Sequence, residues 1–302
     1  MSLPVAILII FSPLLLLMAV LFFWLPRHRA KLGEFPVKEM MLRAPGETLR
    51  RAIAELEEKL LEDIAFVVFG SVAFTAAYLV RQGQRGWTVD PGWWLYLLAN
   101  VGIVWWRSRI LLRHLHDLRN YELGYTGERL VAERIAPLAR DGFLIYHDCP
   151  ANEHGNIDHI VVTPSTVYAI ETKTRRKRPA LDPKRSRAEV TYDGTYLDFP
   201  HGREDFCLDQ ARRQARWLAT LLSQGLAAPV EVKPVLALPG WMVNRIGRGD
   251  VAVVNAKEIP CLMKEKAGQP VDTAAAKRMQ QIEFILDGRC RDVAFGRVTQ
   301  TS

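Results

Sequence analysis

Three charged residues lie in two adjacent apolar stretches, where a β-sheet normally holds valine and isoleucine. The segment NIDHIVVTPSTVYAIETKTRRKR, residues 156–178, contains Asp158, Glu171 and Lys173. Residues two apart in a strand share a face, so Glu171 and Lys173 are expected to point the same way. If the two stretches form an antiparallel hairpin across the short Pro-Ser joint, Asp158 comes near Glu171.

This grouping has the chemistry of a metal site with an assisting lysine. Two carboxylates and the backbone carbonyl of Thr172 are hard oxygen donors, the kind that Mg²⁺ or Mn²⁺ binds. A lysine beside them can orient or deprotonate a nucleophile and offset negative charge on a phosphate. The alternative is an exposed hairpin face that carries a surface salt bridge.

Two further polar residues fall on apolar helical stripes. Glu128 shares a stripe with Val131 and Ile135, and we expect it in the first turn of a helix, whose N-terminal end favours a carboxylate. Gln210 lies seven residues before Trp217, so both should face inward from a later helix. Because buried polar side chains need partners, a site shared with the hairpin would explain both residues.

The elements that must position these residues form a mixed α/β pattern from about residue 121 onward. Gly124 and Gly127 are interpreted as turn and helix-start residues. Hydrophobic periodicity predicts one apolar stripe at Val131, Ile135 and Leu138 and another at Phe206, Trp217 and Leu221. The predicted order is helix 126–139, strands 143–147, 157–163 and 166–173, helix 204–222, strands 232–239 and 251–254, and helix 272–286. This order indicates a mixed sheet flanked by helices.

A strongly basic loop follows Lys173, in a chain whose net charge is +7. Such a loop favours salt-sensitive contact with the phosphate backbone of a nucleic acid, DNA more than RNA. The alternative is a loop that rests on anionic lipid headgroups. The candidate nucleic-acid-binding residues are Arg175, Arg176, Lys177, Arg178, Lys184, Arg185 and Arg187.

Histidine and cysteine usage argues against zinc and against a disulfide framework. The four cysteines are scattered and form no Cys-x-x-Cys pair, which fits a reducing compartment. The spacing of His147, Cys149, His154 and His159 matches no regular zinc pattern. His159 should alternate to the face opposite Asp158, and we expect it to be a hydrogen-bonded residue of the core or near the site.

The first third of the chain reads as membrane anchoring. Leu3–Pro26 carries no charge over 24 residues, long enough to cross a bilayer. A cleaved signal peptide fits less well, because no basic region precedes this stretch and no small-residue cleavage site follows it. The basic RHRAK after it places the N-terminus outside and the following residues in the cytoplasm.

Two shorter apolar segments follow, at 64–80 and 93–106. At about 14 to 17 residues they are marginal spans, so a buried helical hairpin is the alternative, but tryptophans at the segment ends favour a membrane. The expected result is a multi-pass inner-membrane protein with a cytoplasmic C-terminal domain. The predicted parts are a first transmembrane helix at 1–26, a cytoplasmic linker with an amphipathic helix at 27–62, a transmembrane hairpin at 63–106, a basic juxtamembrane helix at 107–120 and an α/β domain at 121–302.

The α/β part resembles a known family. The runs GYTGERLVAERI, FLIYHDCP, GNIDHIVVTPSTVYAIETKT and LDQARRQARWLATLL are similar to the nuclease-related domain (NERD) family, over about residues 121–263. That family is similar in turn to restriction-endonuclease-like folds with an Asp…Glu-x-Lys centre. The segment FCLD before Gln210 departs from the Asn-Pro-like helix start expected there.

The resemblance implies metal-dependent cleavage of nucleic acid phosphodiesters. By position, Asp158 and Glu171 match the metal-binding carboxylates and Lys173 the catalytic lysine. Glu128 and Gln210 match the glutamate of the first helix and the helical glutamine. A homodimer is a further expectation, since single-site nuclease domains often pair to cut both strands. The alternatives are an inactive module that binds nucleic acid or a protein partner at the membrane, and an envelope scaffold that binds lipid.

The expected topology can be tested with a reporter fused after Ser302. An odd number of spans with the N-terminus outside places this end in the cytoplasm, so a reporter active only in the cytoplasm should be active. Activity of a periplasmic reporter at the same position would reverse the orientation.

Overall fold

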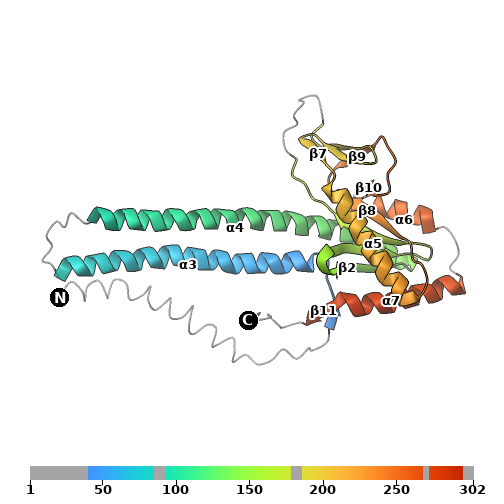
Figure 1. Cartoon of the computed structure of the whole chain (residues 1–302), viewed down its shortest axis with the longest axis horizontal. Helices are drawn as coiled ribbons and strands as arrows, with labels where there is room; N and C mark the ends of the chain where they lie inside the picture. Colours follow the sequence, from blue (N-terminus) through green and yellow to red (C-terminus); the bar gives the residue numbers. More distant parts are fainter. Residues whose placement is uncertain (1–39, 85–92, 178–185, 268–271, 295–302) are drawn as a thin grey trace. The chain divides into compact units, whose positions relative to one another are not determined.

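The computed structural model of the chain describes residues 40–84, 93–177, 186–267 and 272–294 (Figure 1). They belong to two compact units. The helical unit contains Ala54–Arg119, and the α/β unit combines Glu39–Ile53 with Asn120–Phe295. The apolar segment 3–26 predicted to be the first transmembrane helix lies outside the described residues, as do Arg178, Lys184 and Arg185.

The helical unit is an antiparallel pair formed by parts of α3 (Glu47–Gln84) and α4 (Trp93–Ile135). Near one end of the pair, the Tyr96 ring lies against Tyr78, with ring centroids 4.8 Å apart. Near the other end, Asp63 lies 2.8 Å from His114 and 3.4 Å from Arg107. The predicted helical hairpin is therefore present.

The apolar part of α3 has the length and composition of a membrane span. Among the described helices it is the one long and apolar enough to cross a bilayer, and 6% of its apolar window is buried. The segment 93–106 of α4, also predicted to be a span, is not apolar enough over the length of a bilayer crossing, because Arg107 and Arg109 follow only 14 uncharged residues. Several large apolar side chains of both helices are exposed, among them Leu61, Phe66, Leu95, Leu98 and Trp105.

The structure corrects the predicted start of the first helix of the α/β domain. A single helix, α4, runs to Ile135 and joins the segments that were predicted separately at 93–106, 107–120 and 126–139. The short helix η2 (Ala136–Asp141) follows it. Gly124 and Gly127 are therefore helix-interior residues, and the placement of Glu128 in a first helical turn was wrong. Glycine costs about 1 kcal/mol in a helix but does not end it, and no proline interrupts residues 92–136.

The predicted mixed sheet is confirmed. Five strands pair in the order β10-β8-β4-β3-β2. The β2–β3 and β3–β4 pairs are antiparallel, whereas β4–β8 and β8–β10 are parallel. The strands are β2 (Leu144–Pro150), β3 (Asn156–Val162), β4 (Val167–Thr172), β8 (Val232–Ala237) and β10 (Ala252–Val254).

Helices cover both faces of this sheet. On one face, α5 (Phe206–Leu226) and α7 (Thr273–Cys290) bury an apolar cluster that includes Ile160, Leu218 and Leu286. On the other face, the end of α4, η2 and α6 (Ile259–Ala267) enclose a second cluster. It buries the three predicted stripe residues, Val131 and Ile135 of α4 and Leu138 of η2. The apolar runs Ile160–Val162 of β3 and Val167–Ile170 of β4 follow, because both faces of these strands are covered.

The inward face of α5 differs from the predicted stripe. Phe206 is 61% exposed, because the stripe that meets the sheet begins one residue later. The buried residues of α5 are Cys207, Leu208, Ala211, Gln214, Ala215, Leu218 and Leu222. Their spacing of three and four residues is that of an amphipathic helix.

Sequence patterns missed a second sheet and a terminal strand pair. The second sheet has the order β7-β6-β5-β9 and packs around Phe199 and Trp241, whose ring centroids lie 5.0 Å apart. Separately, β1 (Met40–Leu42) pairs antiparallel with β11 (Arg291–Ala294). The remaining elements are η3 (Asn152–His154), β5 (Glu189–Tyr192), β6 (Leu197–Phe199), β7 (Gly202–Glu204) and β9 (Met242–Arg245).

We predict that Gly127→Ala destabilises the α/β unit by on the order of 1–3 kcal/mol, through overpacking. A Cβ at Gly127 would lie 1.8 Å from the Thr174 hydroxyl oxygen and 3.1 Å from its Cβ. Gly102→Ala is the matched control in the same helix, because a Cβ there meets nothing within 4 Å. Thermal unfolding of the full chain in detergent measures both. Equal unfolding temperatures for the two variants would contradict the tight α4–Thr174 contact.

Candidate functional site

The β3–β4 hairpin brings Asp158 and Glu171 together. The pairing runs from Val162↔Val167 to His159↔Ile170, and one further step sets Asp158 opposite Glu171. At this point the backbone N–H of Thr172 donates to Asp158 Oδ2 at 2.6 Å. A side-chain carboxylate thus forms a hydrogen bond with the strand backbone at the end of the hairpin, which fixes its position.

Lys173 is paired with Glu171. Its Nζ lies 2.6 Å from Glu171 Oε1, and the Glu171 side chain is only 2% exposed against 22% for Lys173. The backbone N–H of Lys173 donates to the carbonyl of Ala237, so β8 holds this residue in place. Because both carboxylates are buried, the alternative of a solvated hairpin face does not describe this structure.

Glu128 approaches the same region from α4, where it is 8% exposed. The close contact of Gly127 with Thr174 brings this part of α4 against the chain just after Lys173. Burial raises the pKa of Glu128 to about 8, with further upward contributions from the charges of Asp148 and Glu171. Glu128 therefore holds a proton at neutral pH in the metal-free protein.

The site is rich in negative charge. Burial is the largest cause that raises the pKa of Asp158 well above its ordinary value, and the charges of Glu171 and Glu128 add to it. Burial alone lowers the pKa of Lys173, but the Glu171 carboxylate outweighs that effect and the pKa rises. Lys173 is thus an ammonium ion paired with the Glu171 carboxylate, whereas burial and neighbouring negative charge favour the protonated forms of Asp158 and Glu128.

The donor set suits a hard divalent cation. Glu171 Oε2 is buried and has no hydrogen-bond partner, although a buried carboxylate oxygen normally has one. Within the described residues, no group of three or more His, Cys, Asp or Glu side chains is placed to hold a metal ion. Two carboxylates and a carbonyl therefore remain as protein donors, and Mg²⁺ is commonly bound through one or two carboxylates with water completing its shell.

Gln210 is only partly buried on α5, whereas Gln214, one turn later, is fully buried. Gln214 Nε2 donates to the carbonyl of Asn156 at 2.8 Å, at the start of β3. Gln214 Oε1 has no hydrogen-bond partner. The fully buried glutamine of α5 is thus Gln214, which sequence reasoning did not select.

The basic residues that the structure describes differ in their surroundings. Arg175 donates to both carboxylate oxygens of Glu204, and its guanidinium also contacts the Cys207 sulfur. Arg176, Lys177 and Arg187 are exposed. The exposed residues are accessible to an anionic partner, whereas Arg175 is held by the α/β unit.

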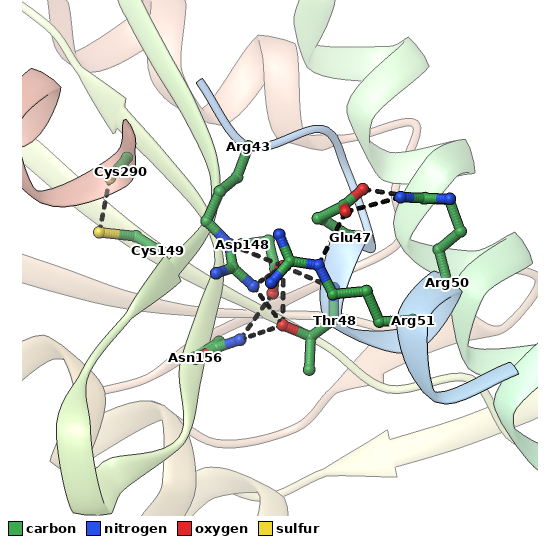
Figure 2. Close-up of polar contacts among 9 residues, drawn as sticks. All are labelled: Arg43, Glu47, Thr48, Arg50, Arg51, Asp148, Cys149, Asn156 and Cys290. Carbon is green, nitrogen blue, oxygen red and sulfur yellow. Dashed lines mark hydrogen bonds and ion pairs between the residues drawn. The ribbon is translucent and has the colours of Figure 1, made fainter. Parts of the chain in front are cut away.

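Sequence reasoning also missed Asp148, although its segment HDC lies in a run that matched the family. Asp148 is buried on β2 and accepts hydrogen bonds from Arg43, Thr48 and Asn156 (Figure 2). The preceding residue, His147, contacts His159 through their Nδ1 atoms at 2.9 Å. Burial lowers the pKa of both histidines, so this pair is neutral.

Comparison with protein families identifies the domain. Residues 123–239 match the family model described as nuclease-related domain, NERD. This chain contains a nuclease-related domain. The NERD match includes Glu128, Asp158, Glu171, Lys173 and Gln210, and it ends just after β8. No curated protein and no solved structure matches the chain.

We predict that Glu128→Gln stabilises the metal-free protein increasingly as pH rises. The folded pKa of about 8 lies above the ordinary 4.5. Folding therefore retains a proton that the unfolded chain loses, and wild-type stability falls between these values. Near pH 4.5 the variant should match wild type, and at pH 8 it should be more stable by on the order of 4 kcal/mol.

The measurement is thermal unfolding of full-length protein in EDTA from pH 4.5 to 8. Glu153→Gln is the control, because Glu153 is exposed and should shift the curve at no pH. A constant difference between Glu128→Gln and wild type at every pH would show that Glu128 ionises normally.

Proposed function

We propose that this protein is a membrane-anchored, divalent-metal-dependent nuclease that hydrolyses phosphodiester bonds of nucleic acid, DNA more than RNA. The observation that carries the proposal is the unpartnered buried oxygen of Glu171, which lies at the end of the hairpin shared with Asp158 and beside the Lys173 ammonium. The NERD match supports the reaction class. The five-stranded sheet with helices on both faces is compatible with the restriction-endonuclease-like fold that we propose for the domain.

In this proposal, Asp158, Glu171 and the Thr172 carbonyl hold Mg²⁺ or Mn²⁺. When bound, the cation supplies a Lewis acid at the scissile phosphate. The hydrogen bond from Thr172 N–H keeps the Asp158 carboxylate oriented, and Lys173 places a positive charge where negative charge grows during attack. Burial by α4 keeps bulk water away from these groups, which strengthens each electrostatic contact.

Glu128 and Gln210 complete the proposed set of catalytic residues. The raised pKa of Glu128 suits a group that holds or passes a proton near neutral pH. Gln210 offers an amide that can orient a water or a phosphate oxygen. Arg176, Lys177 and Arg187, together with the basic residues outside the described part, would contact the nucleic acid backbone with Arg175 at the rim.

The membrane part of the proposal rests on α3, which is long and apolar enough to cross a bilayer. We propose the inner membrane as the location, with the α/β unit in the cytoplasm. We also propose that the segments 1–26 and 93–106 cross the membrane as further spans. We propose in addition that two copies of the chain pair. Anionic lipid at the cytoplasmic surface would attract the basic stretch that follows Trp106.

We predict that the purified full chain cleaves DNA or RNA in Mg²⁺ or Mn²⁺ but not in EDTA. Glu171→Gln should lower the cleavage rate at least about 100-fold, because it removes a metal-binding charge. Lys173→Met should lower the rate by a similar factor while leaving metal binding in place. Single-turnover cleavage of single- and double-stranded substrates measures these effects, and calorimetry measures Mn²⁺ binding.

The matched control is Glu153→Gln, an exposed carboxylate on η3, which should cleave like wild type. Tight, salt-sensitive nucleic acid binding with no cleavage under any metal condition would overturn the enzyme and support an inactive binding module. Association with anionic vesicles alone would support a lipid-binding scaffold.

A further inference from the structure

Asp148 has an unusual backbone conformation in the middle of a strand. Its φ is +49°, a left-handed value that side-chain-bearing residues seldom adopt. The neighbouring pairs His147↔His159 and Cys149↔Ile157 keep their register on both sides of it. Such a conformation is strained, so other interactions of Asp148 must hold it.

Most of those interactions come from the start of α3 and the residues just before it, about 100 residues earlier in the chain. Asp148 Oδ2 accepts from Arg43 Nη2 at 2.6 Å, Thr48 N at 2.7 Å and Thr48 Oγ1 at 2.8 Å. Asp148 Oδ1 accepts from Asn156 Nδ2 at 2.9 Å. Figure 2 shows these donors converging on one carboxylate. Asp148 thus satisfies a free N–H at the first turn of α3 and places a negative charge at the positive end of that helix.

The segment held in this way covers Glu128. Gly46 precedes α3 with φ at +69°, and a Cβ added there would lie 2.6 Å from the Tyr125 ring and 3.4 Å from Glu128 Oε2. A Cβ at Gly124 would lie 3.0 Å from Leu49 Cδ1. The turn from Gly46 to Leu49 therefore lies directly on the surface of α4 that carries Glu128.

The covering segment is not part of the apolar core. None of the three apolar clusters formed by the described residues contains a residue from 40–53. The segment is held by the Asp148 hydrogen bonds, by β1 and by the N–H of Arg43, which donates to the Cys290 carbonyl. Loosening it should therefore leave the five-stranded sheet and its helices folded.

We propose that Asp148 and Arg43 are positioning residues that dock the first turn of α3 onto α4 and thereby keep the Glu128 carboxyl buried beside the Asp158–Glu171 pair. Residues 40–53, which lie outside the NERD match, are then part of the site. The catalytic consequence rests on the proposed function, whereas the docking itself does not.

The docking is tested without any activity assay, in the full chain in detergent. A thiol is introduced by Glu128→Cys in a Cys261→Ser background, because Cys261 is the exposed native cysteine among four. Its alkylation by a maleimide is followed by mass spectrometry. Adding Asp148→Asn should raise the alkylation rate at position 128 at least about tenfold, because the covering turn opens more often.

Arg50→Gln is the matched control. Arg50 lies in the same segment but is exposed, and it pairs with Glu47 rather than with Asp148. This variant should leave the alkylation rate unchanged. An equal rate with and without Asp148→Asn overturns the docking proposal. Thermal unfolding of each variant excludes loss of the whole fold as the cause of faster alkylation.

The catalytic consequence is tested by a double-mutant cycle on cleavage. Asp148→Asn should lower kcat about tenfold in the wild-type background, with KM unchanged, and should have no further effect on the residual rate of Glu128→Gln. An equal loss in both backgrounds would mean that Asp148 does not act through Glu128. If wild type cleaves no substrate, the proposed function fails, and the alkylation result still decides the docking.

Discussion

Removing a carboxylate from water costs several kcal/mol unless a cation, hydrogen bonds or a proton accompanies it. The α/β unit buries four of them within electrostatic range of one another, namely Glu128, Asp148, Asp158 and Glu171. Two are matched by cations, because Arg43 pairs with Asp148 and Lys173 with Glu171. Burial raises the pKa values of the other two, Glu128 and Asp158, which favours their protonated, uncharged forms. The strands and helices around the four carboxyl groups hold these pairings and this burial in place.

Each neighbouring element has a specific part in it. The β3–β4 hairpin sets Asp158 opposite Glu171, and β8 holds the backbone of Lys173. Gly127 lets α4 approach closely enough for Glu128 to reach the same region. The first turn of α3 closes over Glu128, through hydrogen bonds to Asp148 and through the contacts of Gly46 and Leu49 with α4. Cations, oriented carboxylates and restricted water access together are the physical requirements of phosphoryl chemistry in general.

Local patterns predicted the central part of this arrangement well. The strands around Asp158 and Glu171 were predictable because both are continuous apolar runs joined by a tight turn, and the stripe through Val131 and Ile135 was buried as expected. The continuity of α4 through Gly124 and Gly127 was missed, because glycine weakens a helix without ending it. Gln210 was chosen over Gln214 because it lies seven residues before Trp217, a side chain that is only partly buried.

What no local pattern could reveal is the contact between distant segments. Arg43 and Asp148 are 105 residues apart, and β1 pairs with β11 some 250 residues later. The pairing of β1 with β11 has a consequence for the synthesis of the chain. β1 is synthesised about 250 residues before β11, the strand that pairs with it. This pairing cannot hold the covering segment until β11 has been made, and a chain truncated before β11 would lack it.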